Sequence, residues 1–490
     1  MTLRRRNFVG CLLGGLAGRL AALPPRPKLL VLIVLDQFRS DYLDAPGAPF
    51  AAGGFRRLME KGAYFPDCRH LASSFPASSI ATLATGAWPA QHGIAADSWY
   101  DRSIRKPVTG GDETLLATTL AAQLAASPRT RISVVALNDA HGALFAGTPE
   151  ARIYSMDENG QFTTLGDTPD WLPAFNLSKN PASLHDAKWL ALGAKADAPA
   201  LRTLAFSPDR PAEFLTLYKS SYFAQNAQFD FAAELIARDK LGAQGTFDLL
   251  CILAGSTGLL GYETGAHHPL MQQMTLQLDR QIESLFNLLT RTPGERNFSL
   301  VVAGAHGAPP EPPAEVRDRM AVSGENVAQA VDRYLNATGN GRVEKYLYPF
   351  LYLDSSGYRD PEPIRQAAAR AAMEHPAVAG YFTAGGACSA HDDWQDRFRN
   401  SFHPVRSGDL MLSYHPEYVE EYGPNRGVSY GSLYNYDVRV PLCLYGPQFR
   451  AGVFENAVAS VDVAPTLARV MGVAPPSSSV GRVLGEALVE

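Results

Sequence analysis

The sequence lacks three features that would place it in a specialised class of protein. It has no uninterrupted apolar run of the ~18 residues that a membrane-spanning helix needs, which excludes a polytopic membrane protein. Clusters of lysine and arginine are absent beyond the first few residues and the net charge is -5, so no nucleic-acid partner is expected. Charged residues are 19% and hydrophobic residues 46% of the 490 positions, a balance that excludes a disordered chain or a coiled coil.

Cysteine is also scarce, with five residues in the whole chain. Cys251 and Cys443 stand inside apolar runs that are typical of buried strands, which predicts free, buried thiols. A disulfide between Cys68 and Cys388 stays open as an alternative if the protein reaches an oxidising compartment.

Residues 1–27 have the composition of an export signal rather than of a folded element. Arg5 and Arg6 are followed by Asn-Phe-Val, a sequence that resembles a twin-arginine signal, and a weakly apolar stretch then continues to Pro24. We therefore expect a periplasmic or exported protein, with signal cleavage and membrane anchoring both open. The alternative is an irregular cytoplasmic N-terminus.

Short apolar runs alternate with segments of helical spacing along the rest of the chain. Because these runs are apolar at every position, they predict strands that are covered on both faces, as in a parallel sheet. The arrangement indicates an α/β fold with helices on both sides of a mostly parallel sheet. The predicted strands are 29–35, 132–137, 249–254, 300–303 and 440–445, and the predicted helices are 115–125, 227–237 and 271–289.

Two segments interrupt this alternation and are interpreted as insertions into a main domain that spans 28–490. The first runs from about 147 to 229 and has mixed patterning. The second runs from about 309 to 407, and its middle predicts a strand, a helix and a strand, which together make a small α+β unit.

Asp36 follows the first apolar run directly, in the sequence Asp-Gln-Phe-Arg-Ser-Asp-Tyr. A carboxylate at the end of a buried strand is a common metal-ligand position in α/β hydrolytic enzymes, although it can also cap the following helix. Four more motifs follow in order: Thr-Gly-Ala-Trp-Pro-Ala-Gln-His-Gly-Ile (85–94), Arg-Ser-Gly-Asp (406–409), Tyr-Asp-Val-Arg-Val-Pro (436–441) and Asp-Val-Ala-Pro-Thr-Leu (462–467).

With these motifs, the chain resembles the alkaline phosphatase superfamily in its type I phosphodiesterase/nucleotide pyrophosphatase branch, and in particular the exported bacterial phosphomonoesterases. The resemblance runs from about residue 28 to residue 490. It implies an alkaline-phosphatase-like fold, a site with two zinc ions, a Thr or Ser nucleophile and the hydrolysis of phosphate esters.

The resemblance also assigns the zinc ligands, and most of those positions differ in this sequence. Asp36 and His306 match two ligands of the second metal ion. The positions where the implied ligand is replaced are Ala305, at the second metal ion, and Gly258, Tyr262 and Arg439, at the first. Because zinc takes about four donors, the two that remain predict a remnant too weak to hold the ion.

The implied nucleophile and phosphate-binding residues differ as well. The nucleophile position falls on Pro76, and Ser74 is the nearest candidate, two residues earlier. Asp97 stands where the resemblance implies an Asn that contacts the phosphoryl group. The Lys and Arg that clamp a monoester correspond to Asn138 and Ala140.

These substitutions suggest a hypothesis about charge. Loss of two zinc ions would leave carboxylates unpaired, and Arg439 brings a permanent cation to one vacated ligand position. We therefore predict that Arg439 pairs with Asp36 or Asp97, and that Arg439 and Asn138 form an anion-binding site.

The main functional prediction is an exported pseudoenzyme that needs no cofactor, has lost two-zinc hydrolysis and binds a small anion, a phosphoester or an unknown protein. One alternative is a phosphomonoesterase or phosphodiesterase with zinc in a non-standard site that uses His267, His268 or His391. Another is a metal-independent enzyme in which His306 activates Ser74 or Ser78.

Overall fold

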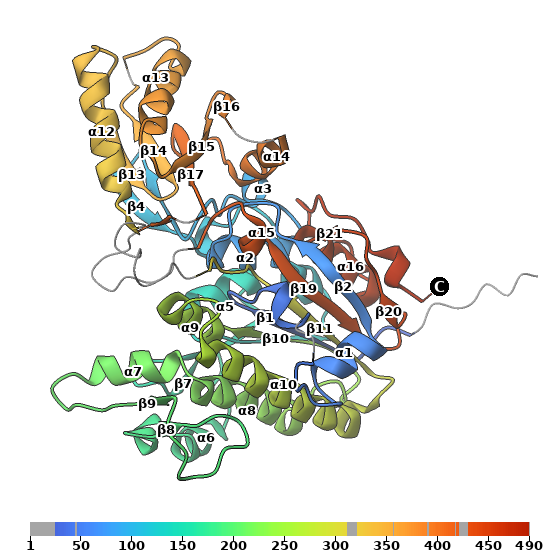
Figure 1. Cartoon of the computed structure of the whole chain (residues 1–490). Helices are drawn as coiled ribbons and strands as arrows, with labels where there is room; N and C mark the ends of the chain where they lie inside the picture. Colours follow the sequence, from blue (N-terminus) through green and yellow to red (C-terminus); the bar gives the residue numbers. More distant parts are fainter. Residues whose placement is uncertain are drawn as a thin grey trace, which may run out of the picture.

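A ten-stranded sheet runs through the centre of the protein (Figure 1). The computed structural model describes residues 25–44, 47–310, 321–355, 357–389, 392–416, 418–420 and 430–489. In order across the sheet, the strands are β20 (Gly452–Val453), β2 (Ala63–Arg69), β19 (Arg439–Tyr445), β11 (Phe298–Gly304), β1 (Leu29–Leu35), β10 (Phe247–Ala254), β5 (Thr130–Val135), β6 (Arg152–Met156) and β7 (Phe162–Leu165), and β21 (Val458–Ala459) pairs with β2.

The five strands in the middle of this sheet, from β11 to β6, run parallel to one another. β1 reads Leu-Leu-Val-Leu-Ile-Val-Leu and is buried along its whole length, as expected for a strand covered on both faces. Its alternate residues point to opposite sides, so that Leu30 and Leu32 join one apolar core, whereas Val31 and Ile33 join the other. One strand therefore contributes to two apolar layers.

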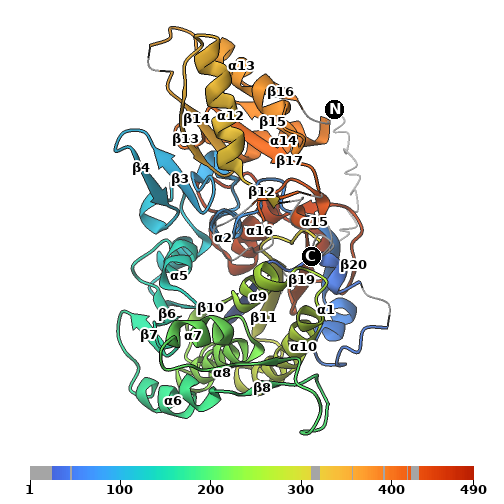
Figure 2. The same ribbon diagram turned by 60° about the vertical axis from the view of Figure 1, so that its left-hand side comes forward.

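Helices cover both faces of the sheet and complete these layers (Figures 1 and 2). The helices on the face of Leu30 are α2 (Pro76–Thr85), α4 (Leu120–Ala125), α5 (Asp139–Ala146) and α16 (Val463–Met471). The helices on the opposite face are α1 (Phe55–Lys61), α8 (Tyr222–Arg238) and α10 (Pro269–Leu289). The predicted α/β fold is confirmed, although β19 and β7 run antiparallel to their neighbours.

A second, antiparallel sheet lies beside the first, at the top of Figure 1. Its strands, in order, are β13 (Val343–Leu347), β14 (Phe350–Leu353), β17 (Leu410–Tyr414), β15 (Val378–Thr383) and β16 (Cys388–Ser389). Two helices, α12 (Gly324–Ala337) and α13 (Glu362–Met373), share one apolar core with this sheet. A second core joins the sheet to Phe75, which directly precedes α2. The small α+β insertion is thus present, and it packs against the main domain beside the start of α2.

The remaining elements are short and connect these layers. The segment between β7 and α8 contains α6 (Leu172–Ser178), β8 (Lys188–Trp189), β9 (Arg202–Thr203) and α7 (Pro211–Lys219). The others are α3 (Pro89–His92), β3 (Ser98–Asp101), β4 (Lys106–Thr109), α9 (Ser256–Thr264), β12 (Ala321–Val322), α14 (Asp392–Ser401), β18 (Val419–Glu420) and α15 (Asn435–Val438).

Cysteine pairing and membrane insertion can be assessed for the described residues. The four cysteines in this part of the chain, Cys68, Cys251, Cys388 and Cys443, are free thiols, so the disulfide considered between Cys68 and Cys388 is not formed. No helix within the described ranges combines the length and apolar character that a bilayer span requires. Residues 1–24, which carry most of the predicted export signal, lie outside the described residues.

Candidate active site

The carboxyl ends of neighbouring parallel strands bring together the residues that follow them. Asp36 follows β1 directly, and His306 lies two residues beyond β11. The N–H group of Asp36 donates to the carbonyl of Ala254 in β10 at 3.3 Å, and the N–H group of Ala305 donates to Leu35 in β1 at 2.8 Å. The strand ladder therefore continues one residue further and places Asp36 beside His306.

Asp36 and His306 form an ion pair at the centre of this site. Nε2 of His306 lies 3.0 Å from Oδ1 of Asp36, and the His306 side chain is fully buried. Nδ1 of the same ring faces the carbonyl oxygen of Gly307 at 2.7 Å, so both ring nitrogens have an oxygen as neighbour. Burial alone would lower the pKa of His306, but the Asp36 carboxylate outweighs it and raises that pKa.

The side chain of Asp36 occupies space that a larger residue at position 258 would need. Gly258 lies in the first turn of α9, and a Cβ atom built on it would lie 2.0 Å from Oδ2 of Asp36. Gly261, one turn later, is in similar contact with Gln37, whose Oε1 would lie 2.6 Å from an added Cβ atom. Both glycines let α9 approach the end of β1 closely.

Asp97 holds the first turn of α2. Its Oδ1 accepts a hydrogen bond from the N–H group of Ala77 at 2.9 Å, and its Oδ2 accepts one from the Tyr430 hydroxyl at 3.1 Å. Burial raises the pKa of Asp97. Pro76 is the first residue of α2, where its missing N–H group costs no hydrogen bond. Asp97 therefore caps a helix. The prediction that it pairs with Arg439 is wrong.

Aromatic rings connect Asp97 to the ion pair. The ring of Tyr430 lies 5.3 Å from that of His306 and 6.2 Å from that of Tyr262, measured between centroids. Tyr262 thus replaces an implied metal ligand with a ring that packs in the site. Nothing in the sequence motifs pointed to Tyr430, whose position follows from the path of the chain before α15.

Ser74, the candidate nucleophile, is buried, and its hydroxyl donates to the carbonyl oxygen of Ser432 at 3.2 Å. Ser432 in turn hydrogen-bonds to Asp437 through both its N–H group and its hydroxyl. Asp437 is fully buried, and burial raises its pKa to about 6. The structure therefore links Ser74 to the segment before β19, and its role as a nucleophile stays a prediction.

Asn138 and His141 lie at the mouth of a small cavity of about 80 Å³ that Asp36 and Ala305 also line. Asn138 caps α5, accepting from the N–H group of His141 at 2.8 Å, and its Nδ2 lies 3.2 Å from Nδ1 of that ring. Ala140 is exposed on the first turn of the same helix. Sequence reasoning missed His141, although it stands three residues after Asn138.

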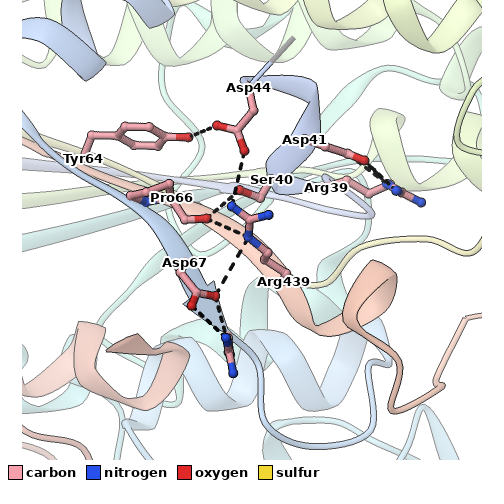
Figure 3. Close-up of polar contacts among 9 residues, drawn as sticks. Arg39, Ser40, Asp41, Asp44, Tyr64, Pro66, Asp67 and Arg439 are labelled. Carbon is pink, nitrogen blue, oxygen red and sulfur yellow. Dashed lines mark hydrogen bonds and ion pairs between the residues drawn. The ribbon is translucent and has the colours of Figure 1, made fainter. Parts of the chain in front are cut away.

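Contrary to the prediction, Arg439 lies outside the site, among Asp44, Pro66 and Asp67 (Figure 3). Its Nη2 lies 3.4 Å from the Asp44 carboxylate, and its Nε donates to the carbonyl oxygen of Pro66 at 3.0 Å. Asp67 is 3.9 Å away, and 41% of the Arg439 side chain is exposed. The guanidinium therefore belongs to a group of surface charges beside β2, and its predicted pairing with Asp36 or Asp97 is wrong.

Two of the alternative histidines, His267 and His268, do not join Asp36 either. Nδ1 of His268 accepts from the N–H group of Leu270 and so caps α10. His267 lines a separate cavity together with Asp41 and Tyr42. His391 lies outside the described residues.

The donors at the site do not fit a pair of zinc ions. Asp36 and His306 are present, but Ala305 and Gly258 carry no donor, and Arg439 points elsewhere. Within the described ranges, no three His, Cys, Asp or Glu side chains are arranged to hold a metal ion. Structural and catalytic zinc sites use at least three protein ligands.

A comparison with known proteins places this site in a family. The sequence profile of the type I phosphodiesterase / nucleotide pyrophosphatase family matches residues 30–427. The chain belongs to this family. It is 26% identical to "Alkaline phosphatase PhoV" of Synechococcus elongatus, over 94% of this chain and 93% of that protein. It is 23% identical to "Alkaline phosphatase PafA" of Elizabethkingia meningoseptica, over 95% of each.

Solved structures agree on the fold. A crystal structure of wild-type alkaline phosphatase PafA superposes with a TM-score of 0.83 and 21% identity, covering 95% of this chain and 99% of that one. A phosphonoacetate hydrolase from Sinorhizobium meliloti superposes with a TM-score of 0.60 and 17% identity, covering 92% and 97%. The alkaline-phosphatase-like fold that the motifs implied is thereby confirmed.

The family relationship corrects the main functional prediction. The pseudoenzyme hypothesis inferred a loss of activity from the altered ligand positions. The relatives that match nearly the full length are, however, described as alkaline phosphatases. They contradict that hypothesis and favour the alternative of a phosphomonoesterase or phosphodiesterase, whose non-standard metal site stays a prediction.

Proposed function

We propose that the protein hydrolyses phosphate esters at the carboxyl end of β1, around Asp36 and His306. The observation that carries this proposal is the similarity to alkaline phosphatases over more than nine-tenths of the chain. The ion pair and the adjoining cavity support this location, because they lie where ligands bind in α/β sheets.

In this reaction, an oxygen atom of water or of a serine bonds to phosphorus, the ester bond breaks, and the alcohol leaves with the proton that the attacking group gives up. Where a serine attacks, a water molecule then hydrolyses the phosphoserine, which releases phosphate, or a phosphomonoester from a diester, and restores the serine. The phosphoryl oxygens need positive or hydrogen-bonding neighbours as charge moves onto them. The Asn138 amide supplies an N–H donor in the cavity lining. His306 acts through Asp36, because both of its ring nitrogens already face oxygen atoms. The partly exposed His141 ring is placed to exchange a proton with the leaving alcohol.

No step of this reaction is assigned to zinc, because the donors do not fit a zinc pair. A monoester carries one more negative charge than a diester, and this site holds the carboxylates of Asp36, Asp97 and Asp437. Their charge disfavours the monoester, so we expect the diester to be the better substrate.

The test is turnover of p-nitrophenyl phosphate and bis-p-nitrophenyl phosphate by the purified protein, with its zinc content measured in the same sample. We expect the Asp36→Asn and His306→Gln variants to lose turnover. The matched control is His415→Gln, which changes an exposed histidine at the end of β17. Absence of turnover in the unaltered protein, or full activity in both site variants, would overturn the proposal.

The Ser74→Ala variant then separates two modes of attack. If Ser74 is the nucleophile, this variant loses turnover and the unaltered protein forms a phosphoserine that can be trapped by acid quenching. If water attacks directly, Ser74→Ala retains turnover and no phosphoserine accumulates.

We also propose that the protein is exported through the twin-arginine route, on the basis of Arg5 and Arg6. The first described residues are already attached to the folded domain: the carbonyl of Pro25 accepts from Gln448 at 2.7 Å, and the guanidinium of Arg26 lies over the ring of Phe247. Cell fractionation of the Arg5→Lys/Arg6→Lys variant tests this export route. We expect the unaltered protein in the periplasm and the variant in the cytoplasm.

A further inference from the structure

Gly258 is the feature of the site that neither the fold nor the family explains. It lies inside α9, where glycine weakens a helix relative to alanine. Its φ angle is not in the left-handed region, so the backbone does not require glycine there. What requires it is the Asp36 carboxylate, because an added Cβ atom would lie 2.0 Å from Oδ2 and 2.5 Å from Cγ of Asp36.

The partner of Asp36 explains why the carboxylate lies so close to α9. In this position, its other oxygen is 3.0 Å from Nε2 of His306, which is fully buried. Within the described part of the chain, neither of these two buried atoms makes a hydrogen bond, so charge attraction across 3.0 Å is what offsets the cost of burying them. A side chain at position 258 would force the carboxylate to rotate away from His306.

We infer that Gly258 is a positioning residue: it makes room for an Asp36–His306 ion pair, which holds the centre of the site in place of zinc. The pair holds an imidazole and a carboxylate 3.0 Å apart without the further donors that zinc would need. This inference deepens the proposed function, but its test does not depend on turnover.

The first test compares Gly258→Ala with Gly255→Ala. Gly255 precedes the first turn of α9, and a Cβ atom there would meet the end of the Leu137 side chain at 3.1 Å and not Asp36. We expect the ring ¹⁵N signals of His306 to move in Gly258→Ala and to stay in place in Gly255→Ala. Unchanged signals in Gly258→Ala would contradict the inference.

The second test is a double-mutant cycle on the free energy of unfolding. If Gly258→Ala acts by separating Asp36 from His306, it destabilises the unaltered protein but has little further effect once His306→Gln has removed the pair. Gly255→Ala, by contrast, should have the same effect in both backgrounds. Additive losses for Gly258→Ala and His306→Gln would overturn the inference.

If Gly258→Ala does not fold, a second variant keeps the inference testable. Replacing Asp36 by alanine as well removes the group that the new methyl meets, so Gly258→Ala/Asp36→Ala should be as stable as Asp36→Ala alone. Failure of this rescue would show that the methyl collides with something other than Asp36.

Metal content gives an independent outcome. We expect elemental analysis to find far less than one zinc per chain after purification in zinc-containing buffer, and chelation with EDTA to leave the melting temperature unchanged. Stoichiometric zinc, or a clear loss of stability on chelation, would overturn the inference. Inactivity of the unaltered protein would refute the proposed hydrolysis but would leave these stability and spectroscopic results intact.

Discussion

His92 gives the most specific prediction about stability. It lies in the Pro-Ala-Gln-His-Gly motif after α2 and is fully buried. Its Nδ1 accepts from the N–H group of Ile94 at 3.1 Å, which leaves the proton on Nε2, 3.1 Å from the Thr82 hydroxyl. The ring is therefore neutral, and burial lowers its pKa from 6.5 to about 3.

The sign of the pH effect follows from this lowered pKa. Between pH 6.5 and about 3, the unfolded chain binds a proton at His92 that the folded protein does not bind, so stability falls as the pH falls. At pH 5, the loss from this one histidine is about 2 kcal/mol, and it approaches about 5 kcal/mol near pH 3. His70 is buried in the same way, with a pKa lowered to about 3, and adds a similar contribution.

The perturbation is His92→Gln, whose amide keeps a donor near Thr82 but cannot take up a proton. We expect this variant to be less stable at pH 7 because a hydrogen bond to Ile94 is lost. Its unfolding free energy, measured by urea titration, should fall less steeply between pH 6.5 and pH 5 than that of the unaltered protein. The exposed His415→Gln variant should keep the full slope. A His92→Gln variant with the unaltered slope would refute the reasoning.

Three further predictions concern charged groups. The Arg439→Ala variant should lower the free energy of unfolding by about 1 kcal/mol or less in urea denaturation, because the ion pairs of Arg439 are partly exposed. It should leave turnover unchanged, and a loss of turnover would show that Arg439 acts in the site. Asp409→Ala should cost about 3 kcal/mol, since this buried carboxylate binds Arg365 at 2.9 Å and the N–H group of Leu353 at 2.8 Å; a loss below about 1 kcal/mol would contradict this. Asp279→Ala should lower the melting temperature clearly, because Asp279 accepts from two N–H groups of the 51–55 loop; an unchanged melting temperature would contradict this.

The sequence was sufficient to predict the sheet, and the family resemblance implied that Asp36 and His306 lie at one metal position. The sheet follows from a local rule, because a strand that is apolar at every position is buried on both faces. Residues that follow parallel strands also meet at one edge, which is consistent with the implied position of Asp36 and His306. Neither prediction required knowing in which direction a side chain points.

The errors arose where side-chain direction decides the outcome. The motif located Arg439 at the start of β19, but it did not tell whether the guanidinium points to the site or toward Asp44 on the surface. Likewise, Tyr430 reaches Asp97 from 333 positions away in the sequence, a contact that depends on how the chain returns to the site. Position 258 was recognised as changed, but the space that this change creates is visible only in three dimensions.

The packing of Phe75 connects the insertion to the candidate site at the carboxyl end of the sheet. Its ring lies 5.8 Å from Tyr348, between β13 and β14 of the insertion, and 5.9 Å from Tyr430 in the site. Phe75 also directly precedes α2, the helix that Asp97 caps. The second sheet and the candidate site therefore contact the same aromatic ring, and we expect a displacement of the second sheet to move Phe75 and the start of α2.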